Sequence, residues 1–185
     1  MNNHKKVSKF LSFVLRHNPQ SIDLSLDVNG WADIDELIEK SRDKIVFNKE
    51  LIVEVVKNND KQRFIIKNNK IRANQGHSIE VDLELKSVTP PDVLYHGTAT
   101  KFIASIMKEG LSKQKRQHVH LSKDIQTATN VGQRHGKLVM LEVDAKKMFE
   151  EGVKFYLSHN GVWLTDSVGV KFLKEIRGIL HNSKK

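Results

Sequence analysis

The chain has 185 residues, of which 38% are hydrophobic and 29% are charged, which is typical of a globular protein with one core or two small ones. It contains no cysteine, which excludes disulfides, thiolate metal sites and a cysteine nucleophile. The net charge of +9 predicts a polyanionic partner. Neither a long apolar run nor a signal-type N-terminal segment is present, so we expect a cytoplasmic protein that does not enter a membrane.

The positive charge is distributed unevenly along the chain. Residues 1–92 carry 15 Lys and Arg against 14 Asp and Glu, whereas residues 93–185 carry 16 against 8. Within the first half, residues 61–78 hold five basic residues and no acidic one. Residues 86–92, KSVTPPD, include two of the three prolines and therefore predict a linker. We expect one domain over residues 1–86, a linker over 87–92 and a second domain over 93–185.

The first half predicts three helices followed by a hairpin. The first helix is indicated by apolar residues at i, i+3, i+4, i+7 and i+8, namely Val7, Phe10, Leu11, Val14 and Leu15. After an Asn29-Gly30 turn, Asp33 and Glu36 have capping-box spacing and open a second helix through about Lys40. A third helix covers residues 51–56, and residues 62–66 and 70–74 alternate as a β-hairpin. This order is that of a winged-helix module, a common nucleic-acid-binding fold.

The first helix ends in Arg16 and His17, two residues before Pro19. One interpretation is local, because cations suit the partial negative charge of a helix C-terminus and proline marks the stop. The other is that the helix presents an anion-binding pair. Arg63, on the first hairpin strand, is out of phase with the apolar residues there and points away from the core, as a surface arginine or as a third ligand of an anion.

The second half predicts short strands with one helix, a mixed α+β lobe. Strands are expected over residues 93–96, 118–122 and 137–143, and a helix over 102–108 that ends at Gly110. A second hairpin, over residues 155–158 and 162–165, turns at Asn160-Gly161. Residues 131–136, VGQRHG, are interpreted as a basic loop between glycines.

Several candidate ligand-binding residues lie in this half. His96 stands at a strand end, and Gly97 beside it permits close approach of a ligand to the backbone. His118 and His120 share one face of a strand, but nothing at ligand spacing completes a zinc site, so no metal is expected. Dinucleotide-binding and phosphate-binding glycine loops of the common types are missing.

Seven segments in this order resemble the NAD-dependent RNA 2′-phosphotransferase family: LRHNP, NGWADIDELI, NDKQRF, IRANQGHS, LYHGT, RQHVHLS and GQRHG. The resemblance covers about residues 7–180. It implies an α+β protein with an N-terminal winged-helix lobe, a C-terminal lobe of the ADP-ribosyltransferase fold, and an active site between them. One departure is Val168-Gly169-Val170, where the family often has Val-Pro-Pro.

The family reaction runs in two steps. The 2′-phosphate of an internal RNA nucleotide, as at a tRNA splice junction, attacks C1″ of NAD and expels nicotinamide. The ribose 2″-hydroxyl then attacks phosphorus, which releases RNA with a free 2′-OH and ADP-ribose 1″,2″-cyclic phosphate. The resemblance places catalysis on Arg16, His17, Arg63 and Arg116, of which the first three come from the N-terminal lobe. The dipole of the first helix is expected to keep Arg16 and His17 cationic.

The resemblance also implies that NAD, as co-substrate, is bound by residues of the second lobe, namely His96, Gly97, Thr98, His120, Ser122, Gly132 and Arg134. His17 is a candidate proton donor for the second step. We expect a monomer that binds RNA and NAD and no membrane. Two alternatives remain open at this point: an ADP-ribosyltransferase acting on terminal phosphates of nucleic acid, and a winged-helix nucleic-acid-binding protein without catalysis.

Overall fold

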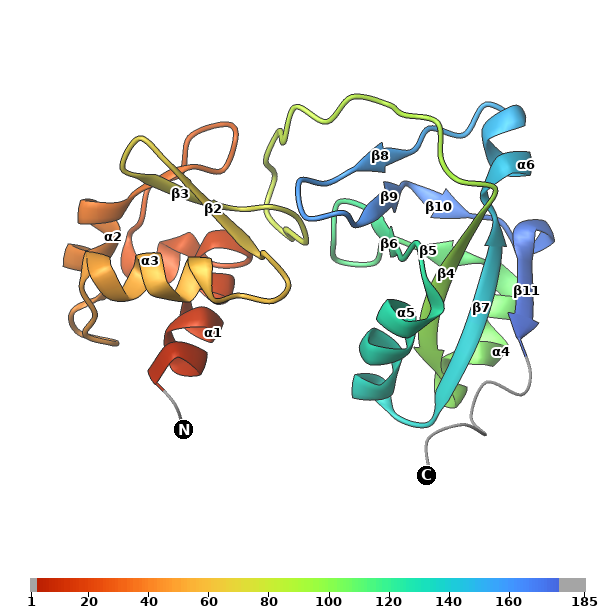
Figure 1. The fold of residues 1–185 in the computed structure, drawn as a ribbon, viewed down its shortest axis with the longest axis horizontal. Coiled ribbons are helices and arrows are strands. Elements are labelled where there is room, and N and C mark those ends of the chain that lie inside the picture. The colour runs from red at the N-terminus through yellow and green to blue at the C-terminus, as the bar shows by residue number, and fades with distance from the viewer. Residues whose placement is uncertain (1–2, 177–185) are drawn as a thin grey trace. The chain divides into compact units, whose positions relative to one another are not determined.

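The computed structural model describes residues 3–176 and has the predicted mixture of helices and strands. The chain forms two compact units (Figure 1). The first contains the residues up to Leu85 together with Lys115–Gln117, and the second contains Lys86–Gln114 and the residues from His118 onward. No helix in the described part of the chain is long and apolar enough to cross a membrane.

The first unit begins with the three predicted helices: α1 (Asn3–Arg16), α2 (Ile34–Ser41) and α3 (Lys49–Lys57). A 3-10 turn, η1 (Pro19–Ile22), follows α1. The periodic apolar residues of α1 account for its position, since Val7, Leu11, Val14 and Leu15 are fully buried in the core of the unit. The opposite face of α1 is polar, which leaves it available for a ligand.

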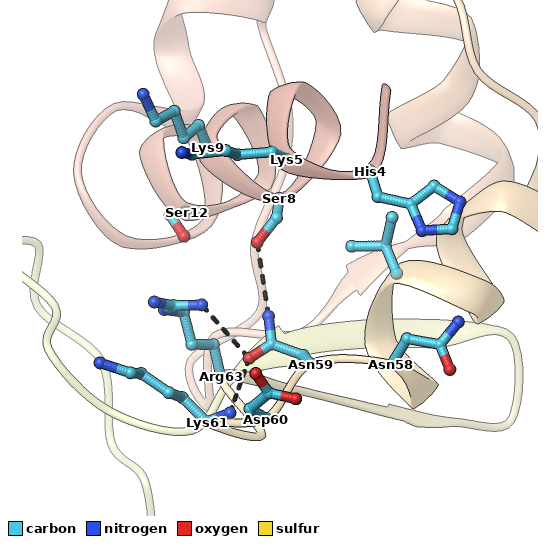
Figure 2. A pocket seen from close by; sticks show the side chains of 11 residues that line it. His4, Lys5, Ser8, Lys9, Ser12, Asn58, Asn59, Asp60, Lys61 and Arg63 are labelled. Atoms are coloured by element: carbon cyan, nitrogen blue, oxygen red, sulfur yellow. Dashed lines mark hydrogen bonds between the residues drawn. The ribbon is translucent and has the colours of Figure 1, made fainter. Parts of the chain in front are cut away.

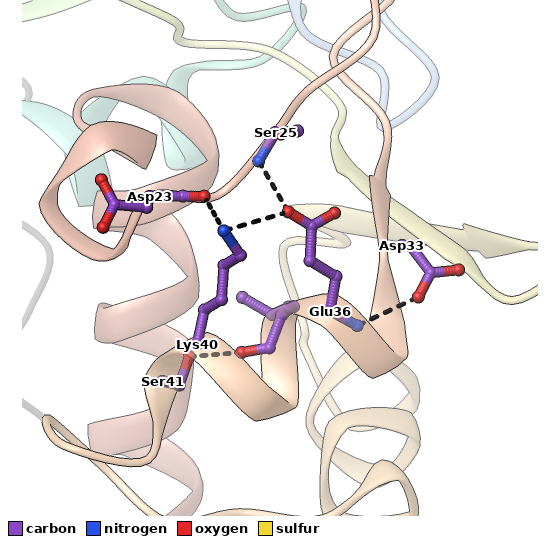
Figure 3. Close-up of polar contacts among 7 residues, drawn as sticks. Asp23, Ser25, Asp33, Glu36, Lys40 and Ser41 are labelled. Atoms are coloured by element: carbon purple, nitrogen blue, oxygen red, sulfur yellow. Dashed lines mark hydrogen bonds and ion pairs between the residues drawn. The ribbon is translucent and has the colours of Figure 1, made fainter.

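The start of α2 shows how the predicted cap is modified (Figure 3). Asp33 is the N-cap, and its Oδ1 accepts a hydrogen bond from the backbone N–H of Glu36 at 3.0 Å. The Glu36 side chain, however, does not return to the cap. Its Oε1 accepts from the backbone N–H of Ser25 at 3.2 Å and pairs with Lys40 at 3.7 Å, while Lys40 donates to the carbonyl of Asp23. The Glu36 and Lys40 side chains thus attach the segment after η1 to α2.

The predicted first hairpin is confirmed. Its strands are β2 (Phe64–Lys67) and β3 (Lys70–Ala73), joined by Asn68 and Asn69 with φ of 48° and 60°, the left-handed pair that a tight two-residue hairpin turn requires. β2 begins at Phe64, later than predicted; Gln62, expected in the strand, has φ of 42°. A short strand, β1 (Ala32–Asp33), extends the sheet in the order β1-β3-β2.

The second unit contains three small antiparallel sheets within its described residues, with strand orders β11-β7-β4, β6-β9-β8 and β10-β5. Their strands are β4 (Val93–Ala99), β5 (Leu111–Ser112), β6 (Val119–Leu121), β7 (Leu138–Asp144), β8 (Tyr156–Leu157), β9 (Trp163–Thr165), β10 (Ser167–Val168) and β11 (Leu173–Ile176). The helices are α4 (Thr100–Glu109), α5 (Ile125–Gly132) and α6 (Ala145–Glu150). The bridge between Tyr95 and Ser122 joins β4 to the end of β6. The predicted hairpin at Asn160-Gly161 is confirmed as β8 and β9.

The interpretation of residues 131–136 as a loop is wrong in part. α5 extends to Gly132 and is followed directly by a 3-10 turn, η2 (Gln133–His135). α5 begins at an Asp124 cap, whose Oδ1 accepts from the backbone N–H of Thr127 at 2.7 Å. The helix has only eight residues and few apolar ones, so its periodicity is too weak to be recognised from the sequence.

The departure at Val168-Gly169-Val170 leaves an ordinary backbone. Gly169 has φ of −68° and ψ of 149°, which lies in the range that a proline ring imposes. Its carbonyl accepts from the backbone N–H of Phe172 at 3.0 Å. The glycine therefore adopts the conformation that a proline at this position would have.

Candidate active site

Arg16 is the last residue of α1 and is held from several sides. Its Nη2 donates to the backbone carbonyl of Arg63 at 3.4 Å, and its guanidinium lies over the Phe64 ring, 5.8 Å from the centroid. Burial, together with the positive charges of Arg63 and Arg116, lowers the pKa of Arg16 to about 10. Arg16 remains charged at neutral pH, and its buried Nε lacks a hydrogen-bond partner among the described residues.

Arg63 lies directly before β2 and is oriented by a neutral side chain. Its Nη1 donates to Oδ1 of Asn59 at 3.2 Å, and the amide of Asn59 donates in turn to Oγ of Ser8 at 3.4 Å (Figure 2). Within the described chain, neither Arg16 nor Arg63 forms an ion pair with a carboxylate. An amide fixes the direction of the guanidinium without compensating its charge, so that charge remains available to an anion.

Arg116 lies in the second half of the sequence, but the structure groups Lys115–Gln117 with the first unit. Gln117 attaches this segment, because its backbone N–H donates to the carbonyl of His77 at 3.2 Å and its side-chain amide donates to the carbonyl of Val81 at 2.9 Å. The charge of Arg116 acts on both Arg16 and His17. All four residues expected to bind phosphate are therefore found in one compact unit, whereas Arg116 was expected from the second lobe.

His17 follows α1 and is exposed, with Nδ1 2.9 Å from Oγ of Ser78. The sequence analysis expected the helix terminus to keep His17 cationic, but the surroundings of His17 in the structure act in the opposite direction. Partial burial, and then Arg16 and Arg116, lower the pKa of His17 below its ordinary value of 6.5. His17 is therefore mainly neutral at pH 7 unless an anion joins the cluster.

His77 lies behind this cluster, 1% exposed. Neither ring nitrogen has a hydrogen-bond partner among the described residues. Burial, followed by the charges of Arg16, His17 and Arg72, lowers the pKa of His77 to about 4. The His77 ring is thus buried and neutral beside the arginines at pH 7. Its protonation would place a further cation in a buried position.

In the second unit, the residues expected to bind NAD come from neighbouring strands. Nδ1 of His96 on β4 lies 3.1 Å from the carbonyl oxygen of His120 on β6. A carbonyl only accepts, so Nδ1 carries the proton and a neutral ring has its lone pair on Nε2. Tyr95 and Ser122 exchange backbone hydrogen bonds of 2.8 Å, which places Ser122 beside this pair. The structure therefore brings His96, His120 and Ser122 together from segments more than 20 positions apart in the sequence.

Gly97 and Gly132 permit close packing of α5 on β4. A Cβ on Gly97 would lie 1.9 Å from the carbonyl oxygen of Ala128, and a Cβ on Gly132 would lie 2.7 Å from the carbonyl carbon of Gly97. The structure thus shows a helix approaching the backbone at Gly97, while the approach of a ligand there stays a prediction. Thr98 next to it is 5% exposed, and Arg134 is exposed on η2, which contacts β4.

The sequence analysis missed three contributions in the first unit: Asn59 behind Arg63, Ser78 against His17, and the buried ring of His77. Asn59 lies in the Asn58-Asn59-Asp60 run after α3, and the other two lie in QGHS. For Asn59 the available signal was a polar run between an amphipathic helix and a basic hairpin. For His77 and Ser78 it was a glycine flanked by polar donors directly after that hairpin, which is a weak indication of an anion site. The described residues include no group of three or more His, Cys, Asp or Glu that could hold a metal ion.

A cluster of three arginines and a histidine, in which Arg16, Arg63 and His17 contact neutral groups, is typical of proteins that bind phosphate groups through charge-assisted hydrogen bonds. Comparison with protein families narrows this class. Residues 2–167 match the model of the RNA 2′-phosphotransferase, Tpt1 / KptA family. The match spans both units, and the chain belongs to this family.

Three relatives are similar to the chain over nearly their whole length. Proteins described as probable RNA 2′-phosphotransferases are 55% identical in Acaryochloris marina, 54% in Fusobacterium nucleatum and 55% in Flavobacterium johnsoniae. These alignments cover 93%, 94% and 92% of this chain and 97%, 99% and 95% of the relatives. The protein is thus a member of a family of transferases, as the motifs predicted.

Proposed function

We propose that the protein removes an internal 2′-phosphate from RNA with NAD as co-substrate, releasing nicotinamide and ADP-ribose 1″,2″-cyclic phosphate. The RNA is of the kind that carries a 2′-phosphate at a tRNA splice junction. The observation that carries this proposal is the cluster of Arg16, His17, Arg63 and Arg116, in which Arg16 donates to a backbone carbonyl and Arg63 to the neutral amide of Asn59. The first unit would serve as a winged-helix RNA lobe and the second as a lobe of the ADP-ribosyltransferase fold.

The chemistry needs the phosphate to be held more than activated. A phosphate monoester has a second pKa of about 6, so it is largely a dianion at neutral pH and requires little help from a base. Guanidinium groups bind such an anion in fork geometry. Arg16 and Arg63, which form no ion pair with a described carboxylate, have their charge available for this purpose.

His17 would change its protonation state when the phosphate binds. Its pKa is lowered by burial and by the arginines, and a dianion at the same place acts in the opposite direction. Substrate binding would therefore charge His17 and prepare it to donate a proton to the 2′-oxygen of the departing RNA. The 2″-hydroxyl of the ribose, which attacks phosphorus, loses a proton in the same step, so the protons balance.

NAD, which supplies the ribose carbon that accepts the phosphate, would be held by the second unit. The donor set supports this assignment, because His96, His120 and Ser122 lie together at the junction of β4 and β6. Ring nitrogens and a hydroxyl suit ribose hydroxyl groups. Thr98 and Arg134 lie on β4 and on η2 beside it. Gly97 and Gly132 would contribute by positioning α5.

The direct test is incubation of the protein with NAD and a short RNA that carries one internal 2′-phosphate. We expect nicotinamide, RNA with a free 2′-OH and ADP-ribose 1″,2″-cyclic phosphate in equal amounts, with no need for added metal. A product that stops at ADP-ribosylated RNA would favour the alternative ADP-ribosyltransferase. RNA binding without nicotinamide release, or activity that EDTA abolishes and zinc or magnesium restores, would contradict the proposed reaction.

A further inference from the structure

A pocket of about 450 Å³ lies in the first unit between the polar face of α1 and the segment that joins α3 to β2 (Figure 2). Its charged lining is strongly basic, with Lys5, Lys9, Lys61 and Arg63 against the single acid Asp60. Arg63 belongs both to this pocket and to the phosphate cluster described above. The pocket and that cluster therefore share one residue.

The polar face of α1 connects the two places. Lys5, Lys9 and Ser12 line the pocket, and Arg16 follows on the same face at the C-terminal end of the helix. At 100° per residue these four positions fall within an arc of about 60°. The rise of 1.5 Å per residue places the backbone of Lys9 about 10 Å and that of Lys5 about 16 Å from Arg16 along the axis. The two lysines thus lie in line with Arg16, displaced from it toward the N-terminus of the helix.

The lysines are arranged at a cost to the helix. Lys5 and Lys9 are an i, i+4 pair of like charge near the N-terminal end of α1, where the first turn has no acidic residue. Both the pair and the helix dipole disfavour cations here. Neither lysine forms an ion pair with another described residue. A bound anion would offset both unfavourable terms.

We propose that this pocket binds a backbone phosphodiester of the RNA next to the nucleotide that carries the 2′-phosphate, with Lys5 and Lys9 as its principal ligands. This inference rests on the proposed function, because it takes the cluster at Arg16 as the site of the 2′-phosphate. Arg63 then contacts both groups and fixes the register of the strand. The pocket makes the enzyme recognise an internal 2′-phosphate within a chain in preference to the same group on a mononucleotide.

The test is a double-mutant cycle between protein and RNA, measured by equilibrium binding without NAD so that it does not depend on turnover. The RNA is a single strand of about ten nucleotides with one internal 2′-phosphate, made with ordinary linkages or with neutral methylphosphonate linkages on one flank. The protein is wild type or Lys5→Ala/Lys9→Ala. Lys6→Ala is the matched control, since Lys6 is an exposed lysine of the same helix outside the pocket.

With ordinary RNA we expect the double variant to bind roughly 5-fold more weakly at 0.1 M salt, and the slope of log K against log salt to fall by about 0.7, the contribution of one single-strand phosphate. Neutral linkages on one flank should weaken binding to wild type by a similar factor and leave binding to the double variant nearly unchanged. Lys6→Ala should behave as wild type. Circular dichroism should show an intact α1, because alanine has the higher helix propensity.

Equal losses from neutral linkages in wild type and double variant, on both flanks, would overturn the proposal, as would an equal loss from Lys6→Ala. A single Lys9→Gln variant, which keeps the length of the side chain, should show the same coupling at about half the size on a logarithmic scale. Failure of the proposed function would appear differently, as a wild-type protein that releases no nicotinamide. If only the proposed role of the pocket is wrong, turnover stays intact, and the effects of the lysine substitutions and of the neutral linkages on binding simply add.

Discussion

Replacement of His77 by leucine tests whether this buried, neutral ring makes the free energy of unfolding depend on pH. The ring is 1% exposed, has no described partner at either nitrogen, and has its pKa lowered to about 4 by burial and by neighbouring cations. The unfolded chain takes up this proton near pH 6.5, so between about pH 6.5 and 4 the unfolded state binds more protons and stability falls as the pH falls. From these two values, lowering the pH from 7 to 5 should cost about 2 kcal/mol through His77 alone.

The measurement is urea unfolding at pH 7 and pH 5, followed by fluorescence of Trp31, which lies in the same unit. Trp163→Phe removes the other tryptophan and is used as the common background. His77→Leu should be at least as stable as the parent at pH 7, since leucine leaves no buried polar atom unpaired. It should lose about 2 kcal/mol less than the parent between pH 7 and pH 5. The same pH dependence in both proteins would refute the assignment of a buried neutral ring.

Three further predictions concern the active site and the glycines. In Asn59→Asp the new carboxylate should pair with Arg63 and compensate its charge. This should raise KM for 2′-phosphorylated RNA by about tenfold while KM for NAD stays constant. An unchanged KM for RNA would contradict the role given to the neutral amide. Arg63→Ala should slow the second chemical step by about 10²–10³ and the first step less, so that ADP-ribosylated RNA accumulates on a denaturing gel, and proportional loss of both steps would argue against this division. Gly97→Ala should lower the melting temperature strongly, because its Cβ would overlap the Ala128 carbonyl. Gly169→Ala should instead stabilise the protein by about 0.4–1 kcal/mol, because Gly169 has φ of −68° and the nearest Phe172 atom would lie 3.5 Å from the new Cβ. Equal effects of the two substitutions on the melting temperature would refute the packing argument.

The local elements were largely determined by the sequence. α1 follows from the spacing of Val7, Leu11, Val14 and Leu15, and the first hairpin follows from alternation around Asn68-Asn69, because apolar periodicity and turn residues act through neighbours in the chain. The missed helix α5 shows where this reasoning stops. Its eight residues carry a weak pattern, and the Gly97–Gly132 contact that supports it joins residues far apart in the sequence.

The residues of the candidate site were also named from the sequence, whereas their electrostatic environment was not. The motifs named Arg16, His17, Arg63 and Arg116, but only the fold places Lys115–Gln117 with the first unit and Asn59 behind Arg63. Burial and the sum of nearby charges set a pKa, and both depend on which distant segments become neighbours. For this reason the sequence suggested a cationic His17, whereas in the tertiary structure burial, and then Arg16 and Arg116, lower its pKa.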